Sequence, residues 1–343
     1  MTDSPAGGPV GVDVHGHGVP REFVEEVRTT RLAGVDVESA DGGGYVLTFP
    51  GGKPLRPMSG ATLDFSARLD WMDSEGLRCQ VVAPWLDVDG QVLDAAAGRD
   101  WVRLLNDHLA AAAGASAGRL RAYATVHLAD PAAAAAALAR AVTDLGMRGC
   151  MIPTSVASGS LSDPAFDPLW EAAQDLGAPV VLHPPTIAPS GSLFARRPVL
   201  KGILGRLIDT TVCAADMIIG GVFDRYPGLT IVLVHGGGFL PYQTGRFDRE
   251  FAGGSSALAL GVPSEYVKRF YYDTVLMSPA ALSLLLDVAG SGQVMLGSDY
   301  GAGARYRNTA RLADSLTALR PDEATYRQVT YETAEGLLRD HSG

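Results

Sequence analysis

The chain has 343 residues, 47% of them hydrophobic, and a formal net charge of −10. This is enough apolar material for a large core, and an α/β barrel of this length forms a single domain. The acidic balance and the lack of a lysine- and arginine-rich cluster argue against nucleic acid or an anionic membrane as a partner.

The cysteine content and the hydropathy of the chain indicate the cellular compartment in which we expect the protein. Cys79, Cys150 and Cys213 are too few and too far apart for a disulfide framework or a cysteine-based zinc site, so we expect buried free thiols. Residues 1–8 lack the apolar stretch of a signal peptide, and no segment approaches the roughly 20 apolar residues of a membrane span. We therefore expect a cytoplasmic protein.

Short apolar runs that alternate with helical patterns predict the fold. The strands are expected at residues 10–15, 80–84, 120–126, 149–153, 179–183, 230–235, 270–276 and 293–298. The helices are expected at 65–75, 99–113, 132–145, 167–176, 211–223, 280–289 and 309–319. Eight strands alternating with helices favour an α/β fold closed into a (β/α)8 TIM barrel, with a doubly wound open sheet as the alternative.

The connection after the first strand is about twice the length of a normal crossover. Within it, residues 35–38 and 45–49 have strand character and flank the turn sequence Asp41-Gly42-Gly43-Gly44, which predicts a hairpin. We therefore expect residues 1–343 to form one barrel domain, with residues 18–61 as a small β-rich insertion that serves as a lid or pocket wall over the barrel mouth.

Polar side chains stand where the predicted strands end. His15 and His17 close the first strand and lie two residues apart, so they share one face. His183 ends the fifth strand, His235 the sixth, and Asp299 follows the eighth. Each alone reads most simply as a polar rim residue. Because the carboxyl ends of barrel strands meet at one mouth, the five together predict an active site.

Three imidazoles and one carboxylate are typical of a mononuclear divalent site, preferably zinc, with manganese or iron as alternatives. A second ion usually needs a bridging group such as a lysine on the fourth strand, and residues 149–153 contain none. His235 is expected beside the metal as an acid/base, since imidazole exchanges protons near neutral pH.

The remaining histidines are weaker candidates. His108 falls inside a predicted helix and His341 in the tail, which favours structural or solvated roles. His127 follows the third strand and is more simply structural than a pocket residue. The glycines after His235 lack the lysine and the spacing of a phosphate loop and are expected to let the backbone pass close beneath the site.

These motifs resemble the amidohydrolase superfamily, in the branch that contains aminocarboxymuconate-semialdehyde decarboxylase. The resemblance is densest over residues 217–227 and 235–246, and includes the His-x-His start, His183-Pro184 and Gly297-Ser298-Asp299-Tyr300. It implies a barrel in which His15, His17, His183 and Asp299 bind one zinc ion, with His235 as the acid/base and Asp299 also part of the catalytic machinery.

The resemblance also implies residues that bind substrate. Arg246 matches an arginine that reaches the neighbouring subunit's site to hold a carboxylate, which implies a homodimer; a surface salt bridge is the simpler alternative. Arg56 approximately matches a second substrate arginine, with Lys53 a weaker candidate. Four positions depart from the family pattern and imply a different substrate. His127 stands where relatives tend to have proline, and a tryptophan of the decarboxylase aligns near Val199. Gly301 and Ala302 replace a Pro-Phe pair, so an aromatic wall is lost.

Together these features favour a metal-dependent, non-oxidative decarboxylase (a carbon–carbon lyase) that acts on a small aromatic or dienoic carboxylic acid. The alternative on the same scaffold is a metal-dependent hydrolase or hydratase acting on an amide, a lactone or an unsaturated acid. A third reading is an inactive barrel used for ligand binding or assembly, which the complete set of site residues disfavours.

Overall fold

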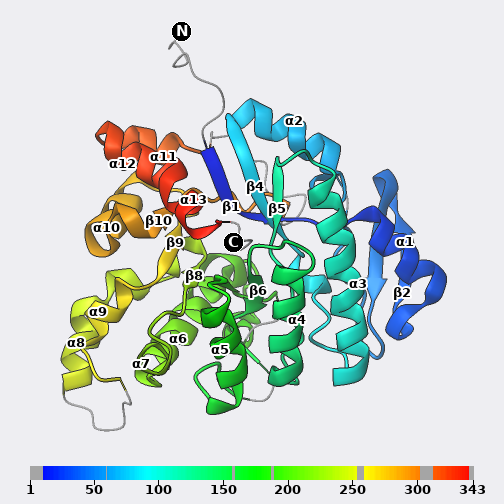
Figure 1. Ribbon diagram of the computed structural model, residues 1–343, viewed down its shortest axis with the longest axis horizontal. Coiled ribbons are helices and arrows are strands. Elements are labelled where there is room, and N and C mark those ends of the chain that lie inside the picture. The colour runs from blue at the N-terminus through cyan, green and yellow to red at the C-terminus, as the bar shows by residue number, and fades with distance from the viewer. Residues whose placement is uncertain are drawn as a thin grey trace.

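The computed structural model describes residues 11–58, 60–156, 159–186, 189–252, 259–301 and 312–339. Eight parallel strands alternate with helices in the predicted (β/α)8 barrel (Figure 1). They are β1 Gly11–His17, β4 Leu77–Ala83, β5 Leu120–Ala122, β6 Cys150–Pro153, β7 Val180–His183, β8 Ile231–Leu233, β9 Tyr271–Asp273 and β10 Val294–Met295.

The ring of strands is assembled from two sheets, ordered β1-β4-β5 and β10-β9-β8-β7-β6. A parallel bridge between Ala124 and Cys150 joins β5 to β6, and one between Gly16 and Tyr300 joins β1 to the chain after β10. At this second seam the amide of His17 also donates to the carbonyl of Tyr300 at 2.6 Å. The first strand and the segment that follows the last strand thus lie side by side.

Several strands are shorter than the apolar runs that predicted them. The sixth and eighth runs were expected to reach His235 and Ser298, but β8 and β10 end at Leu233 and Met295. His235 and Asp299 have φ values of 56° and 60°, in the left-handed region that strands do not use. The backbone therefore turns out of the sheet where the predicted site residues begin.

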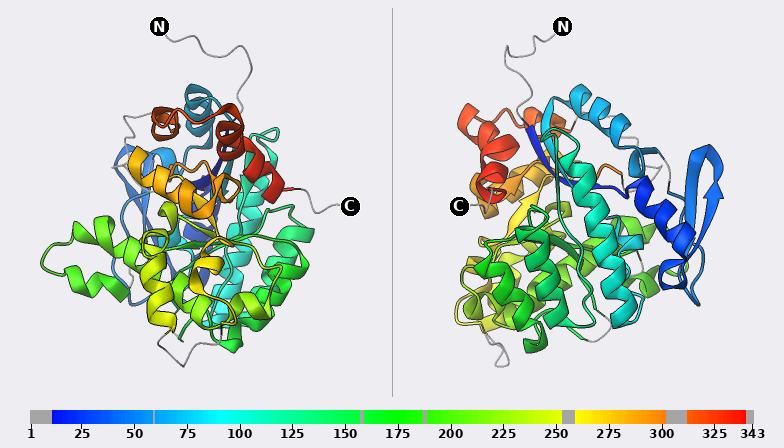
Figure 2. Two further views of the ribbon diagram at one scale, coloured as in Figure 1. Left: turned by 90° about the vertical axis from the view of Figure 1, so that its left-hand side faces the viewer. Right: turned by 45° about the vertical axis from the view of Figure 1, so that its right-hand side comes forward.

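The barrel helices lie outside the strands (Figures 1 and 2). The long ones are α2 Phe65–Glu75, α3 Ala95–Gly114, α4 Pro131–Thr143, α5 Asp167–Asp175, α6 Arg206–Ile219 and α10 Pro279–Ala289. Helix α8 Thr244–Ala252 is as long as α5, and the shorter helices are α7 Val222–Arg225, α9 Pro263–Val267, α11 Asp314–Ala318, α12 Glu323–Arg327 and α13 Thr333–Leu337. Part of the predicted helix 309–319 lies outside the described residues.

Side-chain caps fix where these helices begin. The carboxylate of Asp94 accepts hydrogen bonds from the amides of Ala96 and Ala97, both at 2.9 Å, at the start of α3. Asp64 caps α2 in the same way. Each cap satisfies amides that have no partner within the helix.

Apolar side chains of alternating strand residues fill the inside of the barrel. These residues are fully or almost fully buried and include Val12, Val14, Cys79, Val81, Tyr123, Met151, Val181, Val232 and Met295. A larger layer lies between the strands and the helices. The three cysteines are free and buried, as predicted, and burial raises the pKa of the Cys150 and Cys213 thiols to about 12.

The segment between β1 and β4 contains helix α1 Arg21–Thr30 and an antiparallel hairpin of β2 Asp36–Ala40 with β3 Gly44–Thr48. This unit packs against α3, where the ring of Trp101 meets the ring of Phe23 edge to face at a centroid distance of 5.1 Å. The right-hand view of Figure 2 shows the hairpin beside the barrel. The chain then returns past Arg56 toward α2.

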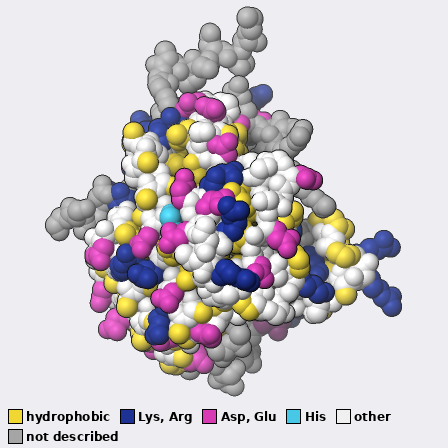
Figure 3. All heavy atoms as spheres, turned by 90° about the vertical axis from the view of Figure 1, so that its right-hand side faces the viewer, with side chains coloured by type: hydrophobic (Ala, Val, Ile, Leu, Met, Phe, Trp, Pro, Cys, Tyr) yellow, Lys and Arg dark blue, Asp and Glu magenta, His cyan; other side chains and the backbone are white. Residues whose placement is uncertain are grey.

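The outer surface carries mixed charges. On the face shown in Figure 3, acidic and basic side chains are interspersed with hydrophobic ones. Within the described residues, no helix is long and apolar enough to cross a membrane.

A buried carboxyl group in the loop after β4 should make the folding stability depend on pH. Burial, reinforced by the nearby Asp87, raises the pKa of Asp89 from 3.8 to about 7, although the Gln91 amide opposes this. Because the unfolded chain loses this proton at lower pH than the folded protein does, stability falls as pH rises from about 4 to about 7.

Asp89→Asn removes this titration while its amide oxygen can still accept from the Gln91 amide, now 3.1 Å from the carboxylate. We expect the variant to be more stable above neutral pH by up to about 4 kcal/mol, and to lose most of the slope. Urea unfolding at about pH 5 and pH 8 measures both quantities. An equally steep fall in the variant would contradict the assignment.

Candidate active site

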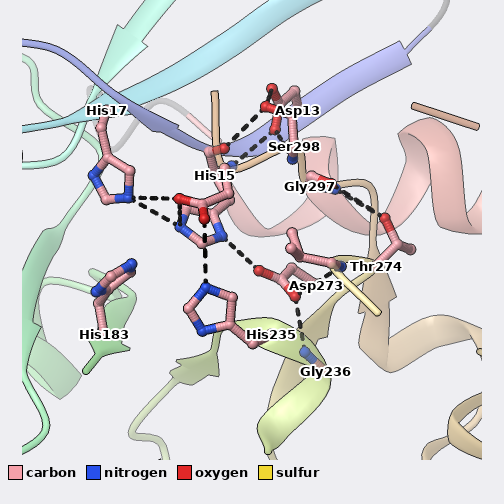
Figure 4. A network of polar contacts seen from close by, with 12 residues as sticks. Asp13, His15, His17, His183, His235, Gly236, Asp273, Thr274, Gly297 and Ser298 are labelled. Carbon is pink, nitrogen blue, oxygen red and sulfur yellow. Dashed lines mark hydrogen bonds and ion pairs between the residues drawn. The ribbon is translucent and has the colours of Figure 1, made fainter. Parts of the chain in front are cut away.

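Four side chains from three strand ends converge at the barrel mouth (Figure 4). One ligand-capable atom from each of His15, His17, His183 and Asp299 lies within 4.8 Å of the others, and all four residues are buried. His17 Nε2 lies 3.2 Å from His15 Nε2 and 3.1 Å from Asp299 Oδ1. The barrel therefore brings together the four residues that the sequence predicted as ligands.

Hydrogen bonds on the far side of two imidazoles orient them toward this cluster. The Nδ1 of His183 donates to the carbonyl of Pro184 at 2.9 Å, and the Nδ1 of His15 lies 2.6 Å from Asp273 Oδ2. Among the described residues, His183 Nε2 is buried without a hydrogen-bond partner. Buried nitrogen lone pairs facing a carboxylate form a donor set that fits a divalent cation.

For three members of the cluster, burial and neighbouring charges favour the protonation states that bind a cation. Burial lowers the pKa of His17, and burial with the neighbouring imidazoles holds the pKa of His183 well below its usual value. Burial alone would raise the pKa of Asp299, but His15, His17 and His235 outweigh it and hold that pKa well below the usual range. His15 differs, because the charges of Asp299 and Asp273 outweigh its burial and raise its pKa. The neutral imidazoles of His17 and His183 next to an ionised carboxylate are the ligand forms that a metal requires.

His235 stands beside these four residues. Its Nε2 lies 3.7 Å from Asp299 Oδ2, and its ring centroid is 5.2 Å from that of His183. The turn that carries it fits closely, because a Cβ added at Gly238 would lie 2.4 Å from the carbonyl oxygen of Leu207. This close approach agrees with the expectation for the glycine run. His235 thus lies at the edge of the cluster, outside the four residues that could hold a metal.

Asp273 was not identified from the sequence. It is fully buried at the end of β9, where its Oδ2 contacts His15 and its Oδ1 accepts from the amide of Gly236 at 2.9 Å. Its carboxylate near the end of a predicted strand was the one feature of the sequence that could have marked it as a site residue. The predicted strand ran on to residue 276, however, so Asp273 was placed inside the strand.

A second buried network of polar side chains, centred on Asp13, could not be predicted from the sequence pattern. Asp13 accepts from the amides of His15 and Ser298, both at 3.0 Å, and from the side chain of Gln80 at 2.5 Å. Gln80 in turn accepts from Arg68, which is fully buried and whose pKa burial lowers to about 10. This network ties the first strand to the last beneath the cluster.

The structure places the two predicted substrate arginines differently. Arg56 lies 4.7 Å from the ring centroid of Trp85, pairs with Asp87 at 3.1 Å and reaches Thr186, which follows His183 by three residues. It therefore lies at the barrel mouth. Arg246 is exposed on α8, and no ion pair to it is found among the described residues. The contacts within one chain do not bring it to the cluster.

Other basic residues lie near and away from the site. Arg206, at the start of α6, adds its positive charge to the burial that lowers the pKa of His17. His127 lines a cleft of about 230 Å³ between α3 and α4. His108 lies on α3, and its Nε2 is 2.9 Å from the carboxylate of Glu26 on α1. Val199 is exposed. His341 and Ala302 lie outside the described residues.

Gly301 explains one departure from the family pattern. Its φ is 93°, and an added Cβ would lie 2.0 Å from the carbonyl oxygen of His17. Proline, whose φ is fixed near −65°, cannot adopt this backbone. The backbone at Gly301, beside the predicted ligand His17, therefore excludes the proline that the family pattern would place here.

Gly301→Ala should both strain this backbone and push His17 away. We expect a loss of at least about 1–3 kcal/mol in the free energy of unfolding and weaker metal binding. Denaturant unfolding and metal titration measure the two effects. Gly336→Ala is the matched control, because a Cβ there meets open space. Equal stability of the two variants would show that the contact with His17 relaxes without cost.

Comparison with known proteins identifies the family. The amidohydrolase family model (Amidohydro_2) matches residues 86–339. The chain belongs to this family and is an enzyme of the amidohydrolase superfamily. This confirms the resemblance inferred from the strand-end motifs.

Two curated relatives match most of the chain. A 2-amino-3-carboxymuconate-6-semialdehyde decarboxylase of Dictyostelium discoideum is 28% identical, over 73% of this chain and 70% of the relative. A 6-methylsalicylic acid decarboxylase of Penicillium expansum is 31% identical, over 73% and 77%. Both relatives are named as decarboxylases.

Solved structures agree in fold. The 5-carboxyvanillate decarboxylase of Sphingomonas paucimobilis has a TM-score of 0.82 and 26% identity, covering 97% of this chain and 99% of that one. A dihydroxybenzoic acid decarboxylase of Polaromonas sp. JS666, solved with manganese and 2-nitroresorcinol, has a TM-score of 0.79, 22% identity and 96% coverage of both chains. At 22% identity, the similarity to the Polaromonas structure supports the fold alone.

Proposed function

We propose that this enzyme is a metal-dependent, non-oxidative decarboxylase of a small aromatic or dienoic carboxylic acid. The observation that carries the proposal is the buried cluster of His15, His17, His183 and Asp299, with His235 at its edge. Its relatives' names point to the same reaction class.

The four clustered residues are proposed to hold one divalent ion. Such an ion supplies a Lewis acid that orients and polarises an anionic substrate. Three nitrogen donors and a carboxylate favour zinc, while the manganese in the Polaromonas structure supports manganese as the alternative. Elemental analysis of the purified protein, followed by reconstitution with each metal, decides between them.

Decarboxylation replaces a C–C bond with a C–H bond. The carboxylate leaves as CO₂, the bonding electron pair stays on the carbon, and one proton must reach that carbon. His235 is proposed to deliver this proton from Nε2, because it is buried beside Asp299 and lies outside the ligand set. Exclusion of bulk water from this buried site would leave His235 as the proton source at hand.

The arginines are proposed to bind the anionic groups of the substrate. Arg56 at the barrel mouth would serve its own site, and Arg246 would serve the site of a second copy in a homodimer with shared sites. The insertion of residues 18–61 brings Arg56 to the mouth and is proposed as the pocket wall. The three free thiols fit a cytoplasmic location.

Mixing two inactive variants tests the shared site. If Arg246→Ala and His235→Ala are each inactive, subunit exchange between them should restore part of the activity, because one site of the mixed dimer keeps both residues. A mixture that stays inactive after demonstrated exchange would place Arg246 outside the neighbouring site.

The reaction itself is tested by incubating the metal-loaded enzyme with hydroxybenzoates, methylsalicylates and dienoic dicarboxylates. Decarboxylation predicts CO₂ in equal amount to product, and in D₂O one deuterium at the carbon that lost it. Water-derived ¹⁸O in the product without CO₂ would instead establish the hydrolase or hydratase. Turnover that persists after complete metal removal would contradict both.

A further inference from the structure

Asp273 contacts the cluster from outside and joins three separate segments. Its Oδ2 lies 2.6 Å from Nδ1 of His15 on β1. Its Oδ1 accepts from the amide of Gly236, next to His235, at 2.9 Å and from the amide of Val275 at 3.1 Å. The side chain is fully buried. Figure 4 shows it between His15 and the Gly236 turn.

The two amides fix which way the carboxylate faces. An N–H group can only donate, so Oδ1 is committed to the backbone and Oδ2 is left to meet the imidazole of His15. An ionised carboxylate can only accept, so the ring nitrogen that faces it must carry the hydrogen. The neutral imidazole then has its lone pair on Nε2, which lies 3.2 Å from His17 Nε2 and 3.4 Å from Asp299 Oδ1.

We propose that Asp273 is a positioning residue that holds His15 in the tautomer protonated on Nδ1, so that Nε2 is free to bind the metal. The inference rests on the proposed metal site. It assigns a role to a residue that touches neither the metal nor the substrate. The same carboxylate anchors the turn after His235, so it also sets the spacing between a ligand and the acid/base.

Asp273→Asn is the discriminating variant, because it keeps the size of the side chain and changes one atom. The Gly236 and Val275 amides should retain the amide oxygen at the Oδ1 position, which turns the NH₂ group toward His15. Two donors then face each other, and His15 relieves this by moving its proton to Nε2. That nitrogen points at the cluster, so the proton competes with the metal.

The tautomer is measured directly. Long-range ¹H–¹⁵N spectra of the metal-free protein, at alkaline pH where imidazole is neutral, report which nitrogen of His15 carries the proton. We expect Nδ1–H in the wild type and Nε2–H in Asp273→Asn. Nε2–H in the wild type would overturn the proposal, and this result does not depend on whether the variant folds.

Metal affinity supplies the second measurement. Titration with Zn²⁺ or Mn²⁺ should give about 10–100-fold weaker binding for Asp273→Asn than for the wild type. Asp216→Asn is the matched control, since Asp216 on α6 accepts from Ser162 at 2.7 Å, a hydroxyl that can reorient. Unchanged affinity in a folded Asp273→Asn protein would overturn the proposal.

The proposed metal site and the role of Asp273 are tested by separate measurements. If the wild type binds no divalent ion, or His15→Ala leaves affinity unchanged, the metal site is wrong. The tautomer of His15 in the metal-free wild type still decides whether Asp273 sets it.

Discussion

Replacing His235 with alanine is expected to lower kcat for decarboxylation by about 10²–10⁴-fold, the usual contribution of a positioned acid/base. The side chain lies beside Asp299 but outside the four ligands, so metal affinity should change little. The rate of CO₂ release at saturating metal and substrate measures the effect, and a parallel metal titration separates it from loss of the ion.

His108→Ala is the control for this experiment, because it removes a histidine that pairs with Glu26 away from the cluster. Its kcat should match the wild type. If His235→Ala still released CO₂ at the wild-type rate, another group would have to supply the proton, and the role proposed for His235 would be wrong.

The second large effect is expected from His183→Ala, which removes one of the three nitrogen donors. Metal affinity should fall at least about 10-fold and activity should be lost at limiting metal. Folding of the metal-free protein should change less, because among the described residues the His183 side chain hydrogen-bonds only to the carbonyl of Pro184.

Thermal unfolding with and without Zn²⁺ or Mn²⁺ provides the measurement. A ligand that binds only the folded state raises the midpoint with concentration. The wild type should therefore show a metal-dependent rise that His183→Ala largely lacks. An equal rise in both proteins would mean that the ion binds elsewhere.

Much of the barrel and its cluster could be predicted because both follow from local patterns. Apolar runs of strand length marked the eight strands, and the meeting of their carboxyl ends brought His15, His183 and Asp299 into one prediction. Strand ends were less predictable. Hydrophobic Val234 follows the last strand residue Leu233, and the left-handed backbone at His235 shows where the sheet stops.

The supporting residues could not be found this way. Arg68 lies in a predicted helix, where an arginine is normally solvated, yet it is fully buried by contacts with segments distant in sequence. Asp273 was hidden inside a predicted strand. A single sequence also carries no signal for which neighbour an exposed arginine such as Arg246 meets.

The seam between the first and last strands has a consequence for assembly. His15 and His17 come from the start of the described chain and Asp299 from near its end, and Asp13 and Ser298 join the same two segments beneath them. The centre is therefore complete only after segments 285 residues apart in the sequence have met. Contacts so distant in sequence form slowly, so we expect the proposed cation site to form only when the first and last strands of the barrel have come together.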